Sequence, residues 1–232
     1  MNKKISIITP TYDEAKNIKK LASRINKSLS NKNYELIIID DNSPDGTGEI
    51  AEELSKKYPV RVIHRKRRLG LSSAVIEGFK AAEGYLICVI DADLSHPPEI
   101  IPKLTERLKT QTADIVIASR LIEGGGTENW PKKRKITSFI ATALARPLTN
   151  VNDLMSGFFL IKKEVIKNVK LIPRGYKILL EILVKGRYKK IVEYPFIFKD
   201  RTAGSSKLNF KTNLEYLRQL VHLYLCKIYK NG

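Results

Sequence analysis

The sequence has few cysteines and no long apolar run, and each absence argues against a class of protein. Only two cysteines, Cys88 and Cys226, occur among 232 residues, so a disulfide framework is not expected and a reducing cytosol fits. No stretch approaches the ~20 consecutive apolar residues of a membrane-spanning helix. The apolar stretch near the N-terminus, Ile5–Ile8, is too short for a secretory signal peptide.

Acidic residues are also scarce relative to basic ones. Lysine and arginine number 42 against 24 aspartates and glutamates, which gives a formal net charge of +18 at pH 7. Such an excess favours an anionic partner, either nucleic acid, an acidic membrane surface or a phosphorylated small molecule, although it also serves solubility. A chain of this length can form one large α/β domain or two small ones.

The first half of the chain alternates short β-rich runs with helical segments. The expected strands are Ile5–Thr9, Tyr34–Ile39, Val60–Ile63, Tyr85–Ile90 and Ile115–Ala118. The expected helices are Glu14–Ser30, Thr47–Tyr58 with Thr47 as its cap, Ser72–Ala82 and Ile100–Lys109. This alternation predicts an α/β fold with a mostly parallel sheet and helices on both faces.

The pattern changes after Arg120, where a glycine-rich loop and a strongly basic run at residues 131–135 follow. The remaining expected elements are the helices Ile136–Leu148, Ile178–Lys185 and Leu214–Tyr229 and the strands Phe158–Ile161 and Ile191–Phe198. The first and last of these helices carry apolar faces. Each either docks on its own domain or lies in a membrane interface.

Two carboxylates follow the fourth expected strand. Asp91 and Asp93 stand one residue apart, which directs both side chains to one side of an extended chain. Both can then reach one hard cation such as Mg²⁺ or Mn²⁺, whose other positions substrate phosphates fill. The structural alternative is that Asp91 ends the strand and Asp93 caps the helix after Pro97 and Pro98.

Other charged residues fall at the same edge of the expected sheet. Asp40 and Asp41 end the second strand, and Arg120 follows the fifth. Ligands of parallel sheets bind outside the carboxyl ends of the strands, so these side chains converge with the Asp91 pair and strengthen the metal interpretation. Asp45 is better explained by turn chemistry, and His96 by structural hydrogen bonding, because hard cations prefer oxygen.

The ordered motifs resemble those of the dolichyl-phosphate mannose synthases, within the large inverting glycosyltransferase family that has a Rossmann-like GT-A fold. The segments that carry the resemblance are Ile7–Ile18, Asp40–Thr47, Asp91–Glu99, Ser156–Phe158, Gly175–Lys177 and Arg201–Leu208. The resemblance extends over essentially the whole chain. Two residues depart from the pattern: Asp13 replaces a frequent Asn, and Ser95 replaces a metal-ligating Gln and reaches less far.

The resemblance implies metal-dependent transfer of mannose from GDP-mannose to dolichyl or polyprenyl phosphate with inversion. It implies a catalytic domain over residues 1–210 and a C-terminal amphipathic helix over residues 211–232. The implied catalytic residues are Asp91, Asp93 and Arg201, and the implied ligands of Mg²⁺ or Mn²⁺ are Asp91, Asp93 and Ser95. The implied donor-binding residues are Pro10, Tyr12, Glu14, Asp40, Asp41, Asp91, Ala92, Asp93 and Lys207. The implied acceptor-phosphate residues are Arg120, Arg134, Ser138, Arg201 and Ser206.

The acceptor decides whether a general base is needed. A lipid phosphate is already anionic near neutral pH, so it needs cationic clamping and orientation rather than deprotonation. A sugar hydroxyl acceptor would need a base, for which Glu181 is the candidate. For Arg134, a solvated charge run is an equal alternative to phosphate binding.

The resemblance and the basic charge together predict a peripheral protein on the cytoplasmic face of a membrane, attracted by anionic lipid. Many relatives continue into membrane helices or pair with a membrane-spanning subunit. The sequence is therefore expected to be a short form, to be trimmed, or to act with a separate membrane-spanning partner.

Three other functions fit parts of the sequence. Sibling enzymes use UDP-glucose with similar motifs, so a polyprenyl-phosphate glucosyltransferase is the main alternative. An NADP-dependent dehydrogenase is suggested by Gly46–Ala51 and Arg65, yet six polar residues separate the strand from the first glycine, and Asp45 would place negative charge beside the pyrophosphate. Nucleic-acid binding is suggested by net charge alone, and the basic residues are scattered, so no such partner is expected.

Overall fold

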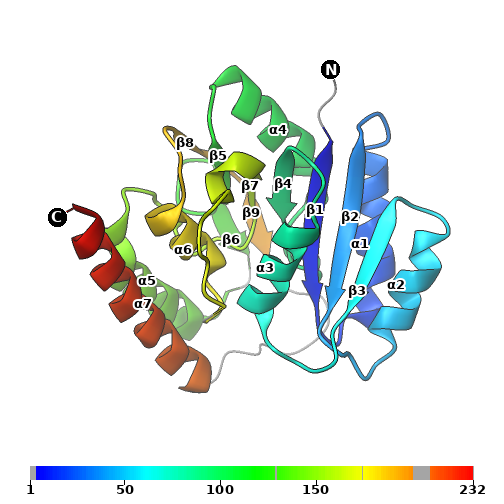
Figure 1. Cartoon of the computed structure of the whole chain (residues 1–232), viewed down its shortest axis with the longest axis horizontal. Helices are drawn as coiled ribbons and strands as arrows, with labels where there is room; N and C mark the ends of the chain where they lie inside the picture. The colour runs from blue at the N-terminus through cyan, green and yellow to red at the C-terminus, as the bar shows by residue number, and fades with distance from the viewer. Residues whose placement is uncertain (1–3, 129, 174, 201–209, 232) are drawn as a thin grey trace.

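The computed structural model describes residues 4–128, 130–173, 175–200 and 210–231, and within them a seven-stranded sheet forms the centre of the protein (Figure 1). Its strands are β1 (Ile5–Thr11), β2 (Tyr34–Asp40), β3 (Val60–His64), β4 (Leu86–Val89), β5 (Ile115–Ser119), β7 (Phe159–Lys162) and β8 (Ile191–Pro195). Their order is β3-β2-β1-β4-β7-β5-β8. Neighbouring strands are parallel except where β7 pairs with β4 and β5.

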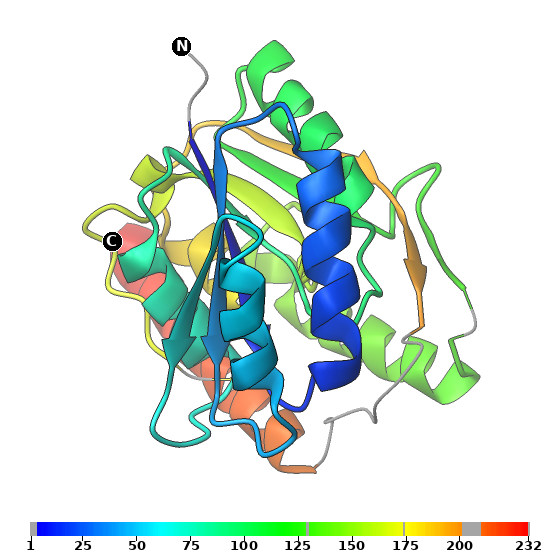
Figure 2. The same cartoon turned by 90° about the vertical axis from the view of Figure 1, so that its right-hand side faces the viewer.

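Helices cover both faces of this sheet. The helices are α1 (Ala15–Ser28), α2 (Thr47–Ser55), α3 (Leu71–Ala81), α4 (Ile101–Thr110), α5 (Lys132–Ala145), α6 (Ile178–Lys185) and α7 (Phe210–Asn231), with 3₁₀ turns at Pro98–Ile100, Arg146–Leu148 and Lys163–Ile166. Side chains of α1, α2 and α4 form one core, on the side that Figure 2 shows with α1 in blue. Side chains of α3, α6 and α7 join the core on the opposite face.

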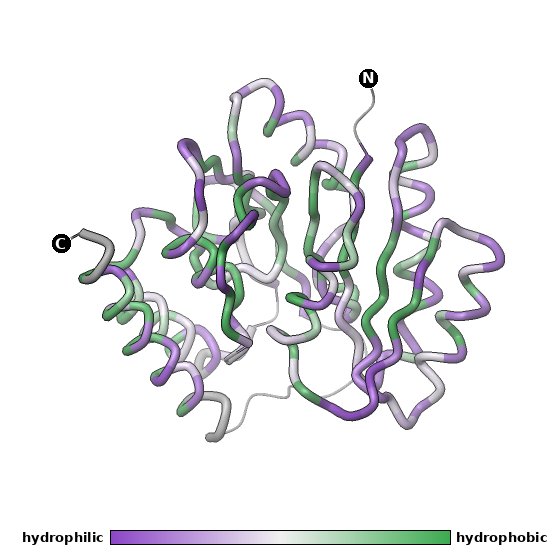
Figure 3. The backbone as a smooth tube through the Cα atoms, viewed as in Figure 1, coloured by the Kyte–Doolittle hydropathy of each residue, from purple (hydrophilic) through white to green (hydrophobic). Residues whose placement is uncertain are grey.

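The alternation of side chains along each strand separates these two cores. In β2, Leu36 and Ile38 belong to the core with α1, whereas Ile37 and Ile39 belong to the core with α3. Because both faces are covered, the central strands are apolar along their length, as Figure 3 shows. The predicted mostly parallel sheet with helices on both faces is therefore confirmed.

Two local predictions were wrong. The run Ile191–Phe198 is not one strand, because Pro195 has no N–H to continue the ladder and the chain leaves the main sheet there. A separate two-stranded sheet follows, formed by β6 (Gly126–Glu128) and β9 (Ile197–Lys199). Thr47 also does not cap α2 with its side chain, because its hydroxyl instead donates to Asp45.

The helices α5 and α7 lie against each other at the end of the molecule away from β3 (Figure 1). The hydroxyls of Tyr216 and Tyr224 on α7 donate to the carbonyls of Ala141 and Leu144 on α5, each at 2.6 Å. The inner face of α7 packs against α6 and joins the core through Leu220 and other buried residues. Within the described residues, no helix combines the length and apolarity needed to cross a membrane.

Candidate active site

Two carboxylates lie just beyond the carboxyl end of β4. Asp93 is buried and its Oδ1 accepts the N–H of Ser95 at 3.1 Å, whereas the side chain of Asp91 is 33% exposed. Leu94 between Asp93 and Ser95 has φ 64°, a left-handed conformation that is uncommon for a residue with a side chain. The chain therefore makes a tight turn that holds both carboxylates at the edge of the sheet.

The donor atoms of this turn suit a hard divalent cation. The Ser95 hydroxyl is buried and, in the part of the chain that the structure describes, has no hydrogen-bond partner. Among the described residues, no three histidine, cysteine or carboxylate side chains gather closely enough to hold a metal alone. Mg²⁺ usually needs only one or two carboxylates, with phosphate and water in its other positions, so Asp91, Asp93 and the orphaned hydroxyl of Ser95 fit such an ion.

His96 supports this turn from behind, as predicted. Its ring packs between Phe158, Phe196 and Phe198 at centroid distances of 5.3 to 5.7 Å, and its Nδ1 accepts the N–H of Asp91 at 3.4 Å. Burial, opposed by the negative charge of Asp93, lowers the pKa of His96 to about 4. The ring is thus neutral at pH 7 and serves as a structural hydrogen-bonding group.

Arg120 follows β5 and pairs with a fully buried carboxylate, Asp153. The guanidinium donates to both oxygens of Asp153 at 2.7 Å, and the backbone N–H of Arg120 donates to the same side chain at 2.9 Å. Asp153 is in turn held by Glu193 on the edge strand β8, which accepts the N–H groups of Asn152 and Asp153 at 2.9 and 3.0 Å. The position of Arg120 therefore depends on a chain of carboxylate contacts that the sequence did not indicate.

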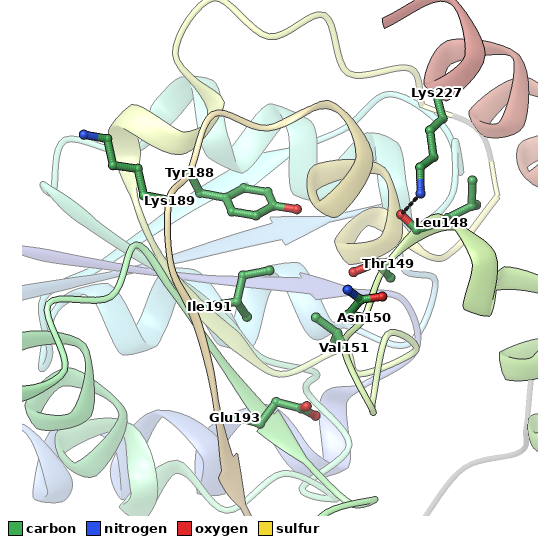
Figure 4. A pocket seen from close by; sticks show the side chains of 9 residues that line it. All are labelled: Leu148, Thr149, Asn150, Val151, Tyr188, Lys189, Ile191, Glu193 and Lys227. Atoms are coloured by element: carbon green, nitrogen blue, oxygen red, sulfur yellow. Dashed lines mark hydrogen bonds between the residues drawn. The ribbon is translucent and has the colours of Figure 1, made fainter. Parts of the chain in front are cut away.

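Glu193 also lines a pocket of about 460 Å³ between β8, residues 148–151 and Lys227 of α7 (Figure 4). The Lys227 ammonium donates to the carbonyls of Pro147 and Leu148 there. None of the nine lining residues is a predicted site residue. The candidate chemistry lies instead at the carboxyl ends of β4 and β5.

Arg134, at the start of α5, shares an aromatic platform with Arg120. Its guanidinium carbon lies 4.4 Å from the ring centroid of Trp130, and that of Arg120 lies 5.3 Å from the same ring. Both also lie within 5.7 Å of the centroid of Phe198. Asp200 accepts a hydrogen bond from Arg134 at 2.8 Å. The two predicted phosphate-binding arginines are thus brought together.

The carboxylates at the end of β2 are buried and already make contacts within the chain. Asp40 accepts hydrogen bonds from Thr11 and from the N–H and hydroxyl of Ser43. Asp41 accepts hydrogen bonds from the Arg65 guanidinium and from the backbone N–H groups of Leu69 and Gly70, in the loop before α3. Donor binding by Asp40 stays a prediction, while the contacts of Asp41 favour a structural role.

The other predicted donor residues lie near this end of the sheet. Pro10 belongs to β1, Tyr12 stacks under the Arg68 guanidinium at 4.0 Å, Glu14 accepts a bond from the Asn17 amide, and Ala92 is buried beside Asp91. Ser138 is half-buried on α5, one turn after Arg134 and on the same face. The predicted residues Arg201, Ser206 and Lys207 lie outside the described residues.

The family model for glycosyl transferase family 2 matches residues 6–170. The chain belongs to glycosyl transferase family 2. A dolichol-phosphate mannosyltransferase of Pyrococcus furiosus is 52% identical over 95% of this chain, which spans 63% of that relative's length. The enzyme of the same name from Saccharomyces cerevisiae is 42% identical over 100% of this chain and 91% of its own. The predicted likeness to dolichyl-phosphate mannose synthases, which are hexosyltransferases, is thus confirmed.

Solved structures show that this family 2 chain shares the GT-A-like α/β fold. A glucosyl-3-phosphoglycerate synthase from Mycobacterium tuberculosis, solved with Mn²⁺, UDP and glucosyl-3-phosphoglycerate, gives a TM-score of 0.69 at 20% identity over 97% of this chain and 80% of its own. A mannosyltransferase from Pyrobaculum calidifontis, solved with GDP-Man and Mn²⁺, gives a TM-score of 0.66 at 15% identity, over 100% of this chain and 66% of its own length. These likenesses support the fold alone.

The contacts also argue against the dehydrogenase alternative. The Arg65 side chain, which would have bound a 2′-phosphate, is buried against Asp41 and faces Glu77 at 3.1 Å. Asp45 accepts the N–H groups of Ala15 and Thr47, so the turn interpretation of Asp45 is confirmed.

Sequence patterns missed three residues of the site: Trp130, Asp153 and Lys177. The Lys177 ammonium donates to the carbonyl of Met155 at 3.0 Å, and burial followed by the charge of Arg120 lowers its pKa to about 8. Lys177 stood inside a recognised motif, and Trp130 is the single tryptophan of the chain. Asp153 offered only one signal, its place three residues before the recognised segment Ser156–Phe158.

Proposed function

We propose that this chain transfers mannose from GDP-mannose to a dolichyl-type polyprenyl phosphate with inversion at the sugar carbon. The observation that carries the proposal is the placement of Asp91 and Asp93 at the same sheet edge as the paired guanidinium groups of Arg120 and Arg134. Carboxylates suit a metal-bound diphosphate donor, and paired guanidinium groups suit an anionic acceptor. The names of the two relatives described above support mannose and a lipid phosphate as substrates.

Asp91 and Asp93 would hold Mg²⁺ or Mn²⁺, with the Ser95 hydroxyl near it. When bound, the ion neutralises charge that develops on the diphosphate leaving group. The chain itself fixes the carboxylates, since Asp93 is bonded to the N–H of Ser95. Gly157 packs closely against Asp91: a Cβ on Gly157 would lie 3.1 Å from Asp91 Oδ2. Two proteins that share this fold were themselves solved with Mn²⁺.

The acceptor needs orientation rather than deprotonation. A phosphate monoester has its second pKa near ~6 and is anionic at neutral pH. Arg120 and Arg134 face it from one aromatic platform, and bidentate guanidinium contacts fix both its place and its direction. Ser138 lies on the same helix face as Arg134, and we include Arg201, Ser206 and Lys207 in the proposal from the motif alone.

The lipid tail of the acceptor would remain in a membrane against α5 and α7. On α5, Phe139 is 74% exposed, and Ile136, Ile140 and Leu144 are exposed on the same helix. A second exposed apolar stripe lies on α7 and consists of Leu214, Leu217, Val221, Leu225 and Ile228. Helices with such stripes bind reversibly at the lipid interface, helped by anionic lipid and basic residues. We therefore propose peripheral attachment at the cytoplasmic face of a membrane.

Thermal unfolding with a panel of nucleotide sugars tests the donor. GDP-mannose with Mn²⁺ should raise the unfolding midpoint, because a ligand that binds only the folded state stabilises it by mass action. Dialysis against a chelator should abolish the shift and added Mn²⁺ should restore it. A shift with UDP-glucose but not with GDP-mannose would replace mannose transfer by the glucosyltransferase alternative.

A further inference from the structure

Lys177 and Arg120 are both bonded to the loop of residues 153–157. Asp153 at the start of the loop holds the Arg120 guanidinium, and the carbonyl of Met155 accepts a hydrogen bond from Lys177 Nζ at 3.0 Å. Two successive residues span at most about 7 Å of chain. Both cations are thus bonded to the same short loop, and the charge of Arg120 acts on the Lys177 ammonium.

The other end of this loop reaches the metal turn. Gly157 lies against Asp91, since a Cβ there would approach Asp91 Oδ2 to 3.1 Å. The charges of Arg120, Asp153 and Asp91 all act on Lys177. Lys177 thus lies within electrostatic reach of Arg120 and of Asp91, one of the carboxylates that would carry the donor metal.

Lys177 differs from the two arginines in how its charge is compensated. Arg120 is paired with Asp153, and Arg134 with Asp200. Lys177 bonds a neutral carbonyl, and within the described part of the chain no carboxylate lies within ion-pair distance of its ammonium. An ammonium has three N–H donors, so two remain for an anion. A partly buried cation of this kind is stabilised when an anionic ligand enters.

We propose that Lys177 is a third cation of the acceptor-phosphate site, an inference that rests on the proposed function. Its two remaining N–H groups donate to the phosphate monoester that Arg120 and Arg134 also hold.

Helix α7 holds the backbone of Lys177 in place. Gln219 on α7 is 2% exposed, and its amide Nε2 donates to the carbonyl of Lys177 at 3.1 Å. Gly175 has φ 65° and lies so close that a Cβ there would be 2.7 Å from Gln219 Oε1. The lysine is therefore held at a defined place by a helix that also carries an exposed apolar stripe.

The test compares Lys177→Met, Lys177→Arg and the control Lys167→Met, which removes the same charge from an exposed position. For Lys177→Met we expect the KM for polyprenyl phosphate to rise about tenfold or more, the loss expected for one charge-assisted hydrogen bond. The KM for GDP-mannose should change by less than about twofold, because the hydrogen bond that is removed contacts the acceptor and not the donor. Lys177→Arg should keep most of the acceptor affinity, and Lys167→Met should match wild type.

The pH profile supplies a readout that a structural role would not move. The charged groups around Lys177 are Arg120, Arg134, Asp153 and Asp91, with the phenol of Tyr176 beside it. With its pKa lowered to about 8, Lys177 loses its proton as pH rises, so kcat/KM for the acceptor should fall above that pH. In Lys177→Arg this decline should vanish, because arginine stays protonated.

A calorimetric titration with octyl phosphate separates this proposal from the proposed function, because it needs no sugar transfer. Binding by wild type and Lys167→Met, lost in Lys177→Met, supports the proposal even if no transfer to lipid phosphate is found. Equal octyl phosphate binding by all variants would overturn it. So would an equal rise of both KM values in Lys177→Met with a lowered unfolding midpoint, since that pattern indicates a structural lysine.

Discussion

Replacing Asp153 by Asn removes the counter-charge of Arg120 and leaves the size of the side chain nearly unchanged. Asp153 is fully buried, and the side chain of Arg120 is only 10% exposed. Removing one partner of a buried pair costs about 3–5 kcal/mol, because the remaining charge is uncompensated. The amide oxygen can still accept the backbone N–H of Arg120, so we expect the lower value, about 3 kcal/mol.

Urea unfolding followed by circular dichroism measures this loss. In a chain of this size 1 kcal/mol moves the thermal midpoint by about 2–4 °C, so the variant should melt roughly 6–12 °C lower. The matched control is Glu99→Gln. Glu99 also makes two 2.7 Å bonds to an arginine, Arg24, but these side chains are 52% and 31% exposed. Exposed pairs contribute about 0–1 kcal/mol, so the control should change little.

The double variant Arg120→Met with Asp153→Asn separates stability from function. With both charges gone, stability should recover to within about 1 kcal/mol of wild type, since replacing a buried pair by uncharged groups is often neutral. Transfer to the lipid phosphate should remain lost, because the acceptor has lost a guanidinium group. If Asp153→Asn is no more harmful than Glu99→Gln, Asp153 is not the buried counter-charge of Arg120.

Three further changes test other parts of the site. Asp93→Ala should abolish transfer and weaken donor binding with the fold intact, and near-normal turnover in saturating Mn²⁺ would remove the metal assignment. Glu181 is buried and accepts hydrogen bonds from the N–H of Ile172 and the ammonium of Lys185. Glu181→Gln should therefore lower stability but leave transfer unchanged between about pH 6.5 and 9, where the acceptor phosphate needs no base. Lost transfer with intact donor binding would instead identify Glu181 as a general base. Replacing Phe139, Ile140 and Leu144 together by Ser should raise the KM for lipid acceptor, weaken sedimentation with anionic liposomes at low salt and spare GDP-mannose binding; unfolding or lost donor binding would instead place these side chains in the core.

Local patterns predicted much of the fold because burial leaves a periodic trace in the sequence. The strand Tyr34–Ile39 is buried along its length and mostly apolar because both faces of the sheet are covered. The direction of β7 leaves no such trace, since a short apolar run reads alike in both directions. Pro195 was a visible signal for the break between β8 and β9, and its missing N–H explains the break.

Some residues of the site could likewise be predicted from the sequence and others could not. The pair Asp91 and Asp93 could be found because the two residues are near neighbours at the end of a strand. The partner of Arg120 could not, because Asp153 lies 33 residues further along the chain and meets it only in the folded protein. Lys177 is similar: its motif was recognised, but its place beside Arg120 depends on the loop of residues 153–157.

The most direct measurement is the transfer of labelled mannose from GDP-mannose to vesicles that contain polyprenyl phosphate, with the purified protein and Mn²⁺. We expect the label to become extractable with the lipid, a chelator to stop the transfer reversibly, and unphosphorylated polyprenol to receive no label. Label that stays in the aqueous phase with GDP-mannose, or that reaches the phosphorylated and unphosphorylated lipids equally, would contradict this expectation.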